Sequence, residues 1–235
     1  MTEVAPVSSS AQLSLLPWLL GWPDATDRTG FAAGLHAGSC LGIGWALRAD
    51  LRSLDAGTAA LLAATTLPAA AAGLVLSDTV EARLGRPGPT AALLALAGVA
   101  LWRADRTAAC RPVGPRQAAA AAAAQVLALA PGVSRSGATV TALRGLGVGR
   151  AEAVRFSMLM SLPVTGGAAA LSLARRGRPA PGVLVGAPVA AVAGALATQV
   201  AVRRGDMLLS GAALYRLGLA AAVAVRLAQQ RRTLP

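Results

Sequence analysis

The residues best suited to chemistry in this chain form one short segment, Pro131 to Thr139, with the sequence PGVSRSGAT. The segment places an arginine and three hydroxyl side chains inside an otherwise apolar stretch, and its proline and glycines interrupt regular structure. Hydroxyl groups and a guanidinium are suitable hydrogen-bond donors to phosphate oxygens. Because irregular backbone at membrane depth occurs only where it is buried in protein or lines a wet cavity, we expect a re-entrant, anion-binding turn. An ordinary Gly/Ser loop outside the bilayer is the alternative.

Arg135 is the strongest candidate residue of this segment. A guanidinium can bind two phosphate oxygens and neutralise the charge that grows during P–O cleavage, which makes Arg135 a candidate catalytic residue. Ser134, Ser136, Gly137 and Thr139 are expected to complete a substrate-binding cradle with the backbone N–H groups of the turn. The alternative is that these hydroxyls only satisfy the backbone groups of a broken helix.

A second polar turn follows the N-terminus, where Glu3 precedes three consecutive serines at positions 8 to 10. Carboxylates near the bilayer are costly and usually functional, so Glu3 is a candidate base and a candidate ligand of a divalent cation. A solvated N-terminal residue is the alternative for Glu3. Ser8 and Ser9 are candidate nucleophiles, which need an activating base, and Ser10 is a candidate substrate-binding residue.

Other polar residues allow two interpretations each. His36 lies in the middle of the apolar run 29–47, as an acid/base group or as a packing and hydrogen-bonding residue. Arg216 interrupts the last apolar run and either reaches into the polar site, as a further substrate-binding residue, or extends to a membrane interface. Arg144 and Arg150 are expected to be solvated or to face lipid headgroups.

The elements that position these residues are predicted to be membrane helices. Of the 235 residues, 55% are hydrophobic and 14% are charged, and the mean hydropathy is +0.58. A helix needs about 20 apolar residues to cross the hydrocarbon core, so five or six of the charge-free runs can span a membrane. These runs are 4–23, 56–77, 87–102, 117–134, 156–174 and 179–202, with 29–47 and 207–225 interrupted only by His36 and Arg216.

The chain is predicted to be a single integral membrane domain, residues 1–235, built from two repeats of about 1–102 and about 117–225. Each half carries a serine-rich turn just after a proline, and three predicted spans separate the two turns. An odd number of spans puts the turns on opposite sides of the membrane, as in an inverted repeat with its polar site near the midplane. The predicted fold is therefore an all-α polytopic membrane protein with two re-entrant helix hairpins that meet near the midplane. Chance similarity between two alanine-rich halves is the alternative.

The net charge of +12 comes from 22 arginines, which are scattered through short loops with few aromatic residues between them. This pattern is unlike a nucleic-acid-binding surface and indicates membrane lipids with anionic headgroups as partners instead. The two cysteines, Cys40 and Cys110, lack metal-ligand spacing, so neither a disulfide framework nor a zinc site is predicted. No cleavable signal peptide is predicted, and the opening on an acid and a Pro/Ser turn leads us to expect a preceding helix upstream.

Together these residues resemble the bacitracin-resistance type of undecaprenyl-diphosphate phosphatase. That family pairs a Glu/Pro/Ser/Ser motif near the N-terminus with a Pro-Gly-x-Ser-Arg-Ser-Gly-x-Thr motif in the second half. Here residues 2–10 resemble the first motif, and residues 131–139 match the second without a mismatch. The surroundings at 125–129, 155–157 and 215–216 are also similar.

The resemblance implies a multi-pass hydrolase of the bacterial plasma (inner) membrane that converts undecaprenyl diphosphate to undecaprenyl phosphate and phosphate. Such an enzyme recycles the lipid carrier for peptidoglycan synthesis and gives bacitracin tolerance. The resemblance also implies dependence on a divalent cation, Mg²⁺ or Ca²⁺, with Glu3, Ser8, Ser9 and Arg135 on the family's motif positions. A homodimer is left open.

Two positions depart from the family pattern. The first motif glutamate of the family would lie just ahead of Met1, which a misassigned start codon would explain. The family histidine expected at position 12 is Gln12, which cannot carry a proton at neutral pH. The alternative function is therefore a lipid-phosphate carrier or flippase, or an impaired homologue without phosphatase activity.

Overall fold

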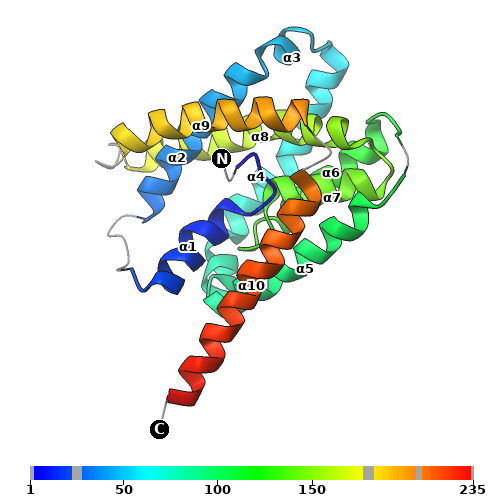
Figure 1. Cartoon of the computed structure of the whole chain (residues 1–235). Coiled ribbons are helices and arrows are strands. Elements are labelled where there is room, and N and C mark those ends of the chain that lie inside the picture. Colours follow the sequence, from blue (N-terminus) through cyan, green and yellow to red (C-terminus); the bar gives the residue numbers. More distant parts are fainter. Residues whose placement is uncertain (1–2, 23–27, 109, 177–182, 205–207, 234–235) are drawn as a thin grey trace.

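The computed structural model describes residues 3–22, 28–108, 110–176, 183–204 and 208–233. Within these ranges the regular secondary structure is helical, apart from one isolated bridge between Arg111 and Val148, which confirms the predicted all-α class (Figure 1). The helices are α1 (Ser9–Leu20), α2 (Arg28–Ala46), α3 (Arg48–Arg52), α4 (Ala56–Leu84), α5 (Pro87–Asp105), α6 (Pro115–Leu127), α7 (Arg135–Gly145), α8 (Arg150–Arg176), α9 (Val183–Arg203) and α10 (Leu208–Thr233).

Four of the described helices are long and apolar enough to cross a membrane. These are α4, residues Arg150–Leu171 of α8, residues Val185–Arg203 of α9 and residues Leu209–Arg232 of α10. The expected spans at 29–47 and 87–102 form the helices α2 and α5. The chain is therefore a multi-pass membrane protein in its architecture, as its composition predicted.

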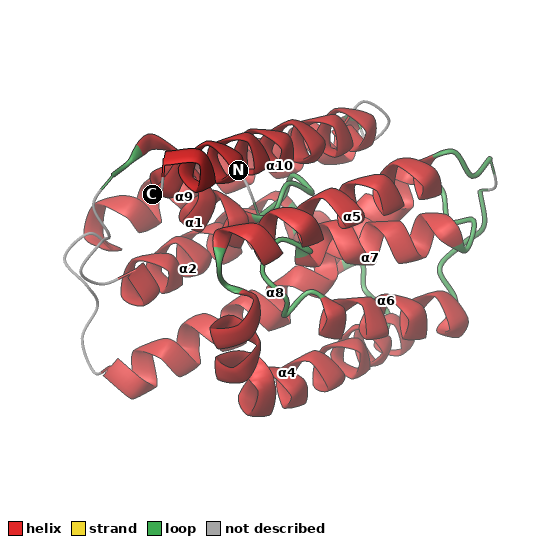
Figure 2. Cartoon of the chain, turned by 90° about the horizontal axis from the view of Figure 1, so that it is seen from below, coloured by secondary structure: helices red, strands yellow, loops and turns green. Residues whose placement is uncertain are grey.

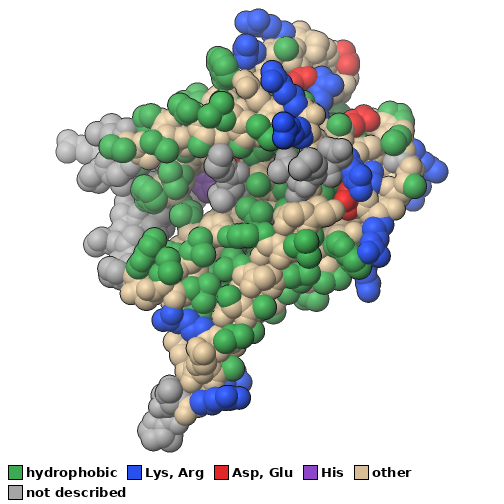
Figure 3. All heavy atoms as spheres, viewed as in Figure 1, with side chains coloured by type: hydrophobic (Ala, Val, Ile, Leu, Met, Phe, Trp, Pro, Cys, Tyr) green, Lys and Arg blue, Asp and Glu red, His purple; other side chains and the backbone are tan. Residues whose placement is uncertain are grey.

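The surface of the bundle matches a lipid environment. On α9, the exposed side chains of Val185, Val189, Val192, Leu196 and Val200 follow one another at spacings of three or four residues and so share one face. Figure 3 shows blue arginine side chains over α3, at the right-hand edge and along the lower part of α10, with an apolar surface between them. Basic groups at the ends and apolar groups between them are the pattern of a protein surrounded by lipid.

The two apolar runs that carry the polar turns are broken into short helices. The run 4–23 contains a turn and the 12-residue α1, while the run 117–134 contains most of the 13-residue α6 and the turn before the 11-residue α7. At 1.5 Å per residue, each of these helices is only about 17–20 Å long, too short for a hydrocarbon core of about 30 Å. Because α6 packs along α7, the two form a helical hairpin that carries the motif turn between them.

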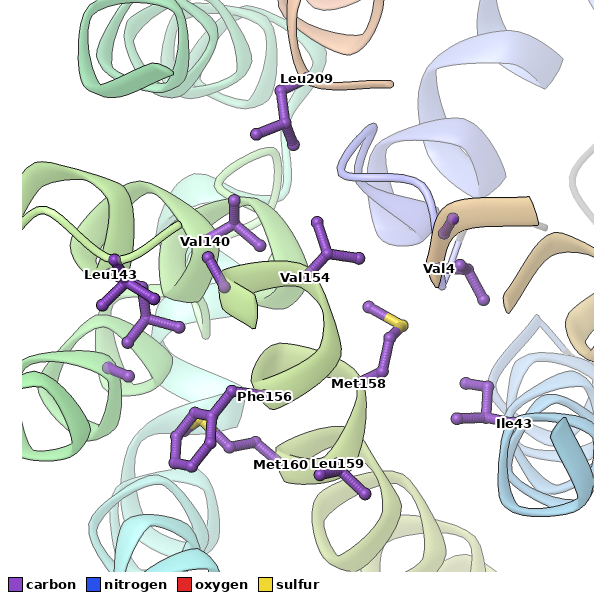
Figure 4. Packing of buried hydrophobic residues seen from close by; sticks show 14 of the residues in the cluster. Val4, Ile43, Val140, Leu143, Val154, Phe156, Met158, Leu159, Met160 and Leu209 are labelled. Atoms are coloured by element: carbon purple, nitrogen blue, oxygen red, sulfur yellow. The ribbon is translucent and has the colours of Figure 1, made fainter. Parts of the chain in front are cut away.

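Both polar turns are buried among the helices rather than exposed at the ends of the bundle. In the first turn, Val4 is part of the main apolar core, and Figure 4 shows Met158 pointing toward the space between Val4 and Ile43. In the second turn, Gly132 has a φ of 96°, and a Cβ there would overlap the carbonyl oxygen of Thr90 on α5. Only glycine fits this position, so the motif turn lies directly against α5. Seen from below, green turn segments lie among the helices in the middle of the view as well as at its edges (Figure 2).

A buried acid fixes the far end of the motif helix α7. Asp105 accepts hydrogen bonds from Arg150 Nε at 2.6 Å and from Ser210 Oγ at 3.2 Å, and Arg144 Nε lies 3.7 Å from the same carboxylate. Arg144 is itself buried and also donates to the carbonyl oxygen of Val148. The expectation that Arg144 faces solvent or headgroups is therefore wrong, because Asp105 supplies a buried counter-ion. Arg150, whose side chain is 41% exposed, reaches both this carboxylate and the surface.

Small residues bring α2 and α9 into unusually close contact. A Cβ at Gly38 would overlap the carbonyl oxygen of Ala187, and a Cβ at Gly42 would overlap that of Ala191. Glycines four residues apart lie on one helix face and let two backbones approach closely, as is common between membrane helices. This contact holds α2, and with it His36, against the rest of the bundle.

We therefore expect Gly38→Ala to destabilise the protein by roughly 1–3 kcal/mol, because its methyl group has no space against the α9 backbone. Gly167→Ala on α8 is the matched control, since no atom lies within 4 Å of a Cβ built there. The control should leave stability unchanged or raise it by up to about 1 kcal/mol, because alanine is the better helix former. Reversible unfolding in detergent measures both variants, and equal stability of the two would contradict the close contact.

Candidate active site

The two serine turns share an unusual backbone geometry. Ser8 and Ser134 have φ values of 68° and 70°, and they are the only non-glycine residues with positive φ in the part of the chain that the structure describes. Such a conformation costs a non-glycine residue about 1–3 kcal/mol and tends to occur at functional sites. Each serine precedes a short helix, α1 or α7, and points its hydroxyl at that helix.

The hydroxyls of these two serines cap the helices in the same way. Ser8 Oγ accepts a hydrogen bond from the backbone N–H of Ala11 at 3.4 Å, and Ser134 Oγ accepts one from Gly137 at 3.2 Å. Each hydroxyl also lies near the hydroxyl of the serine two positions later. The Ser8 and Ser10 oxygens are 3.2 Å apart, and the Ser134 and Ser136 oxygens are 3.4 Å apart. The free N–H groups at such a helix start favour an anion.

Glu3 connects the first turn to the second. Its Oε2 accepts a hydrogen bond from Arg135 Nη2 at 3.5 Å, and its Oε1 lies 3.2 Å from Nδ1 of His36 on α2. The hydroxyl of Ser9 lies beside the same carboxylate. The structure therefore brings together three of the residues predicted as catalytic, Glu3, Ser9 and Arg135, and adds His36 to them.

This cluster keeps unused hydrogen-bonding capacity although it is buried. The side chains of Glu3 and Arg135 are 10% and 13% exposed, and that of His36 is 31% exposed. Glu3 Oε1, His36 Nδ1 and Arg135 Nη1 are buried atoms without a hydrogen-bond partner among the described residues, since the Glu3–His36 contact is close but not aligned as a hydrogen bond. Buried polar atoms are nearly always paired, so three unpaired atoms at one place indicate a site built for a bound polar group.

The other residues predicted for the second turn divide into two groups. Ser134 and Ser136 stay at the start of α7, close to Arg135, where their hydroxyls can reach a ligand. Thr139 lies one turn further, fully buried, and its hydroxyl is 2.6 Å from that of Ser157 on α8. The direct binding role of Thr139 stays a prediction, and its bond to Ser157 ties α7 to α8.

The structure decides between the two interpretations of Arg216, which were a position in the polar site and a position at a membrane interface. It is fully buried, and its Nη2 donates a hydrogen bond to the carbonyl oxygen of Val133 at 3.2 Å. A Cβ at Gly137 would overlap its guanidinium, so the glycine of the motif makes room for this side chain. Arg216 therefore reaches the motif turn from α10 and does not extend to a membrane interface.

Gln12, which stands at the position of the family histidine, is held by two hydrogen bonds. It donates from Nε2 to the carbonyl oxygen of Val7 at 3.1 Å and accepts one from the hydroxyl of Tyr215 at 2.7 Å. These bonds join the first turn to α10 next to Arg216. Gln12 thus has a structural role that needs no ionisable group.

His36 is the residue of this site whose role stayed open in the sequence, between an acid/base group and a packing residue. Its burial beside an acid depends on how α2 packs against the N-terminal turn, and no local motif shows that contact. The one available signal is that His36 is the single histidine of the chain and lies in an apolar helix.

Within the described residues there is no group of three or more His, Cys, Asp or Glu side chains that could hold a metal ion. Glu3 is the only carboxylate of the cluster, and its two oxygens face His36 and Arg135. The described residues alone therefore do not form a complete cation site. Mg²⁺ commonly binds through one or two carboxylates together with substrate phosphates, and Glu3 fits that partial role.

Comparison with known proteins gives this geometry a family context. A family model described as "Bacitracin resistance protein BacA" matches residues 1–222. A relative from Geobacter sulfurreducens named undecaprenyl-diphosphatase is 40% identical over an alignment of 235 positions. The alignment covers 86% of this chain and 84% of the relative. Proteins of the same name from Geobacter metallireducens and Gemmatimonas aurantiaca are each 38% identical, covering 83% and 70% of this chain and 81% and 68% of the relatives. A family match over nearly the whole chain and relatives at this identity lead to one conclusion: the chain belongs to the bacitracin resistance protein BacA family.

Proposed function

We propose that this protein hydrolyses undecaprenyl diphosphate to undecaprenyl phosphate and phosphate. The family and the names of its relatives support this activity. The structural observation that carries it is the buried cluster of Glu3, His36 and Arg135, whose unpaired polar atoms need a charged or polar ligand. In the bacterial plasma (inner) membrane, this activity returns the lipid carrier to peptidoglycan synthesis and gives tolerance to bacitracin.

Arg135 binds the terminal phosphate in this proposal. Its Nη1 has no partner, and its position at the start of α7 places it beside the free N–H groups of a helix start. A guanidinium together with oriented N–H groups stabilises the negative charge that develops as the P–O bond breaks. Ser134 and Ser136 add hydroxyl donors on the same turn.

Glu3 and Ser9 supply the attacking group. The Ser9 hydroxyl lies beside the Glu3 carboxylate, whereas the Ser8 hydroxyl caps α1, so Ser9 is the better placed nucleophile. Glu3 accepts the proton of Ser9 as the serine oxygen bonds to the terminal phosphorus, and the bond to the bridging oxygen breaks. The electron pair of that broken bond stays on the bridging oxygen, which takes the proton from Glu3 and leaves as part of undecaprenyl phosphate. Water then attacks the phosphoserine and releases phosphate, which restores the serine hydroxyl.

In our proposal, Glu3 would hold a divalent cation, Mg²⁺ or Ca²⁺, together with oxygens of the bound substrate. When bound, it neutralises phosphate charge and polarises the P–O bonds. In this proposal, the residues of the chain bind and orient the diphosphate in the same way with the cation and without it.

We further place the two serine turns at membrane depth, in re-entrant segments that belong to two inverted repeats. Three observations support this arrangement: both turns are buried, both lead into helices too short to span, and Ser8 and Ser134 share their backbone and capping geometry. Substrate with a membrane-embedded lipid chain then reaches the site from within the bilayer.

Replacing Arg135 with glutamine should lower phosphate release from undecaprenyl diphosphate by roughly 100- to 1,000-fold, as loss of a donor to a developing anion commonly does. Arg116→Gln, an exposed arginine at the start of α6, is the matched control and should keep its activity. The assay uses purified protein in detergent, with and without Mg²⁺ or Ca²⁺. Release that is unchanged in Arg135→Gln would exclude the proposed role of this guanidinium.

Replacing Ser9 with alanine should lower phosphate release by about 1,000-fold or more, because the proposed mechanism then lacks its attacking oxygen. Ser14→Ala on the same helix is the matched control, since Ser14 donates only to the carbonyl oxygen of Ala11. Activity of Ser9→Ala within tenfold of that of the unmodified protein would rule out a phosphoserine at this position.

The same purified protein separates hydrolysis from transport. In vesicles loaded with undecaprenyl diphosphate, the proposal requires release of inorganic phosphate. Movement of the lipid across the bilayer without phosphate release would identify a carrier instead, the alternative that Gln12 in place of the family histidine left open.

A further inference from the structure

Arg216 carries a buried charge that no carboxylate among the described residues neutralises. The residue is fully buried on α10, within the stretch Leu209–Arg232 that is apolar enough to span a membrane. Among the described residues no carboxylate lies within ion-pair distance of its guanidinium, and Nε and Nη1 have no hydrogen-bond partner. A lone buried cation is strongly unfavourable, so this group requires an anion from outside the chain.

The surroundings of Arg216 keep a defined space for its side chain. Gly137 of α7 faces the guanidinium, and a Cβ at Gly98 of α5 would lie only 3.2 Å from Cβ of Arg216. The one bond that its guanidinium makes, to the carbonyl oxygen of Val133, orients it against the motif turn. Two glycines on two helices thus hold Arg216 in place while its remaining N–H groups stay unused.

Arg216 and Arg135 approach the same turn of the chain from different elements. Arg216 contacts Val133 and Gly137, which lie on either side of Arg135 in the sequence. Arg135 contacts Glu3 of the first turn, while Arg216 arrives from α10. The start of α7 is therefore flanked by two guanidinium groups, each with unpaired nitrogens, and only one of them lies beside the acid and the Ser9 hydroxyl.

Two cationic groups that reach the start of the same helix fit a ligand with two adjacent phosphoryl groups. We propose that Arg216 binds the phosphate next to the lipid chain, while Arg135 binds the terminal phosphate that is attacked. This assignment rests on the proposed phosphatase function, because the attacked phosphate must lie beside Glu3 and Ser9. It makes Arg216 the residue by which the site distinguishes a diphosphate from a monophosphate, since a monophosphate engages Arg135 alone.

The test measures binding of two simple probes, inorganic diphosphate and inorganic phosphate, to the purified protein by titration calorimetry in detergent. In the unmodified protein diphosphate should bind more tightly than phosphate. In Arg216→Gln the affinity for diphosphate should fall by roughly 10- to 100-fold, the usual effect of losing hydrogen bonds to a charged group, while the affinity for phosphate changes less than about threefold. In Arg135→Gln both affinities should fall.

Two further variants separate binding from folding. Arg226→Gln changes an arginine on the same helix whose Nη1 donates to the carbonyl oxygen of Leu19, and it should alter neither affinity. Arg216→Lys keeps the buried charge and loses the Nη donors, so it should show the same selective loss to a smaller extent. This variant serves as the test if Arg216→Gln does not fold, and thermal unfolding of each variant establishes that it does.

The subsite is overturned if Arg216 variants that fold bind diphosphate as well as the unmodified protein does, or lose phosphate and diphosphate affinity equally. Failure of the proposed function looks different. Selective loss of diphosphate binding in a protein that releases no phosphate from undecaprenyl diphosphate would retain the subsite and reject hydrolysis. Phosphate release with no selective loss would retain hydrolysis and reject the subsite.

Discussion

The contact between Glu3 and Arg135 joins two segments that lie 132 positions apart in the sequence. Each group alone would be a poorly tolerated charge inside an apolar bundle, and together they offset part of that cost. The compensation is incomplete, because Arg135 Nη1 has no hydrogen-bond partner in the described residues and Glu3 Oε1 has only its unaligned contact with His36. The bundle therefore contains an incompletely satisfied polar site where the N-terminal turn meets the motif turn, and a charged phosphate ligand can complete it.

The helices around this junction are arranged so that short elements present the site and long elements support it. α1 and α7 each follow an N-cap serine with positive φ, Ser8 and Ser134, whose hydroxyl accepts a hydrogen bond from the first turn of the helix. The backbone strain at Ser8 and Ser134 persists because the surrounding contacts fix both turns. Gly132 lies against α5, and Val4 is part of the main core. At its far end, α7 is held by Asp105 through Arg144, so the motif helix is anchored at both ends.

Much of this organisation could be predicted from sequence, because local patterns carry it. Apolar runs predicted the helices, and the proline, glycines and hydroxyls of residues 131–139 predicted a polar turn of unusual structure. The same residues, with Glu3 and Ser8, carry the resemblance to the family. Each of these signals lies within one continuous stretch of the chain.

Contacts between segments that are distant in the sequence were harder to predict. Arg144 was expected at the surface, and its burial depends on Asp105, which lies 39 positions earlier. The direction of Arg216 stayed open because its partner is a backbone carbonyl, at Val133, that no side-chain pattern reveals. The role of His36 stayed open because its place beside Glu3 follows from the packing of α2. The glycines at 34, 38 and 42 were a readable sign of that close packing, and they mark the helix face that lies against α9.

The central claim is that Glu3 and Arg135 act as one unit within a single buried site. A double-mutant cycle on phosphate release, with Glu3→Gln, Arg135→Gln and the variant that carries both changes, tests it most directly. If the two groups work together, the double variant is about as slow as the slower single variant, because each change already disrupts the same unit. If the two losses multiply, Glu3 and Arg135 act independently, and the joined site described here is contradicted.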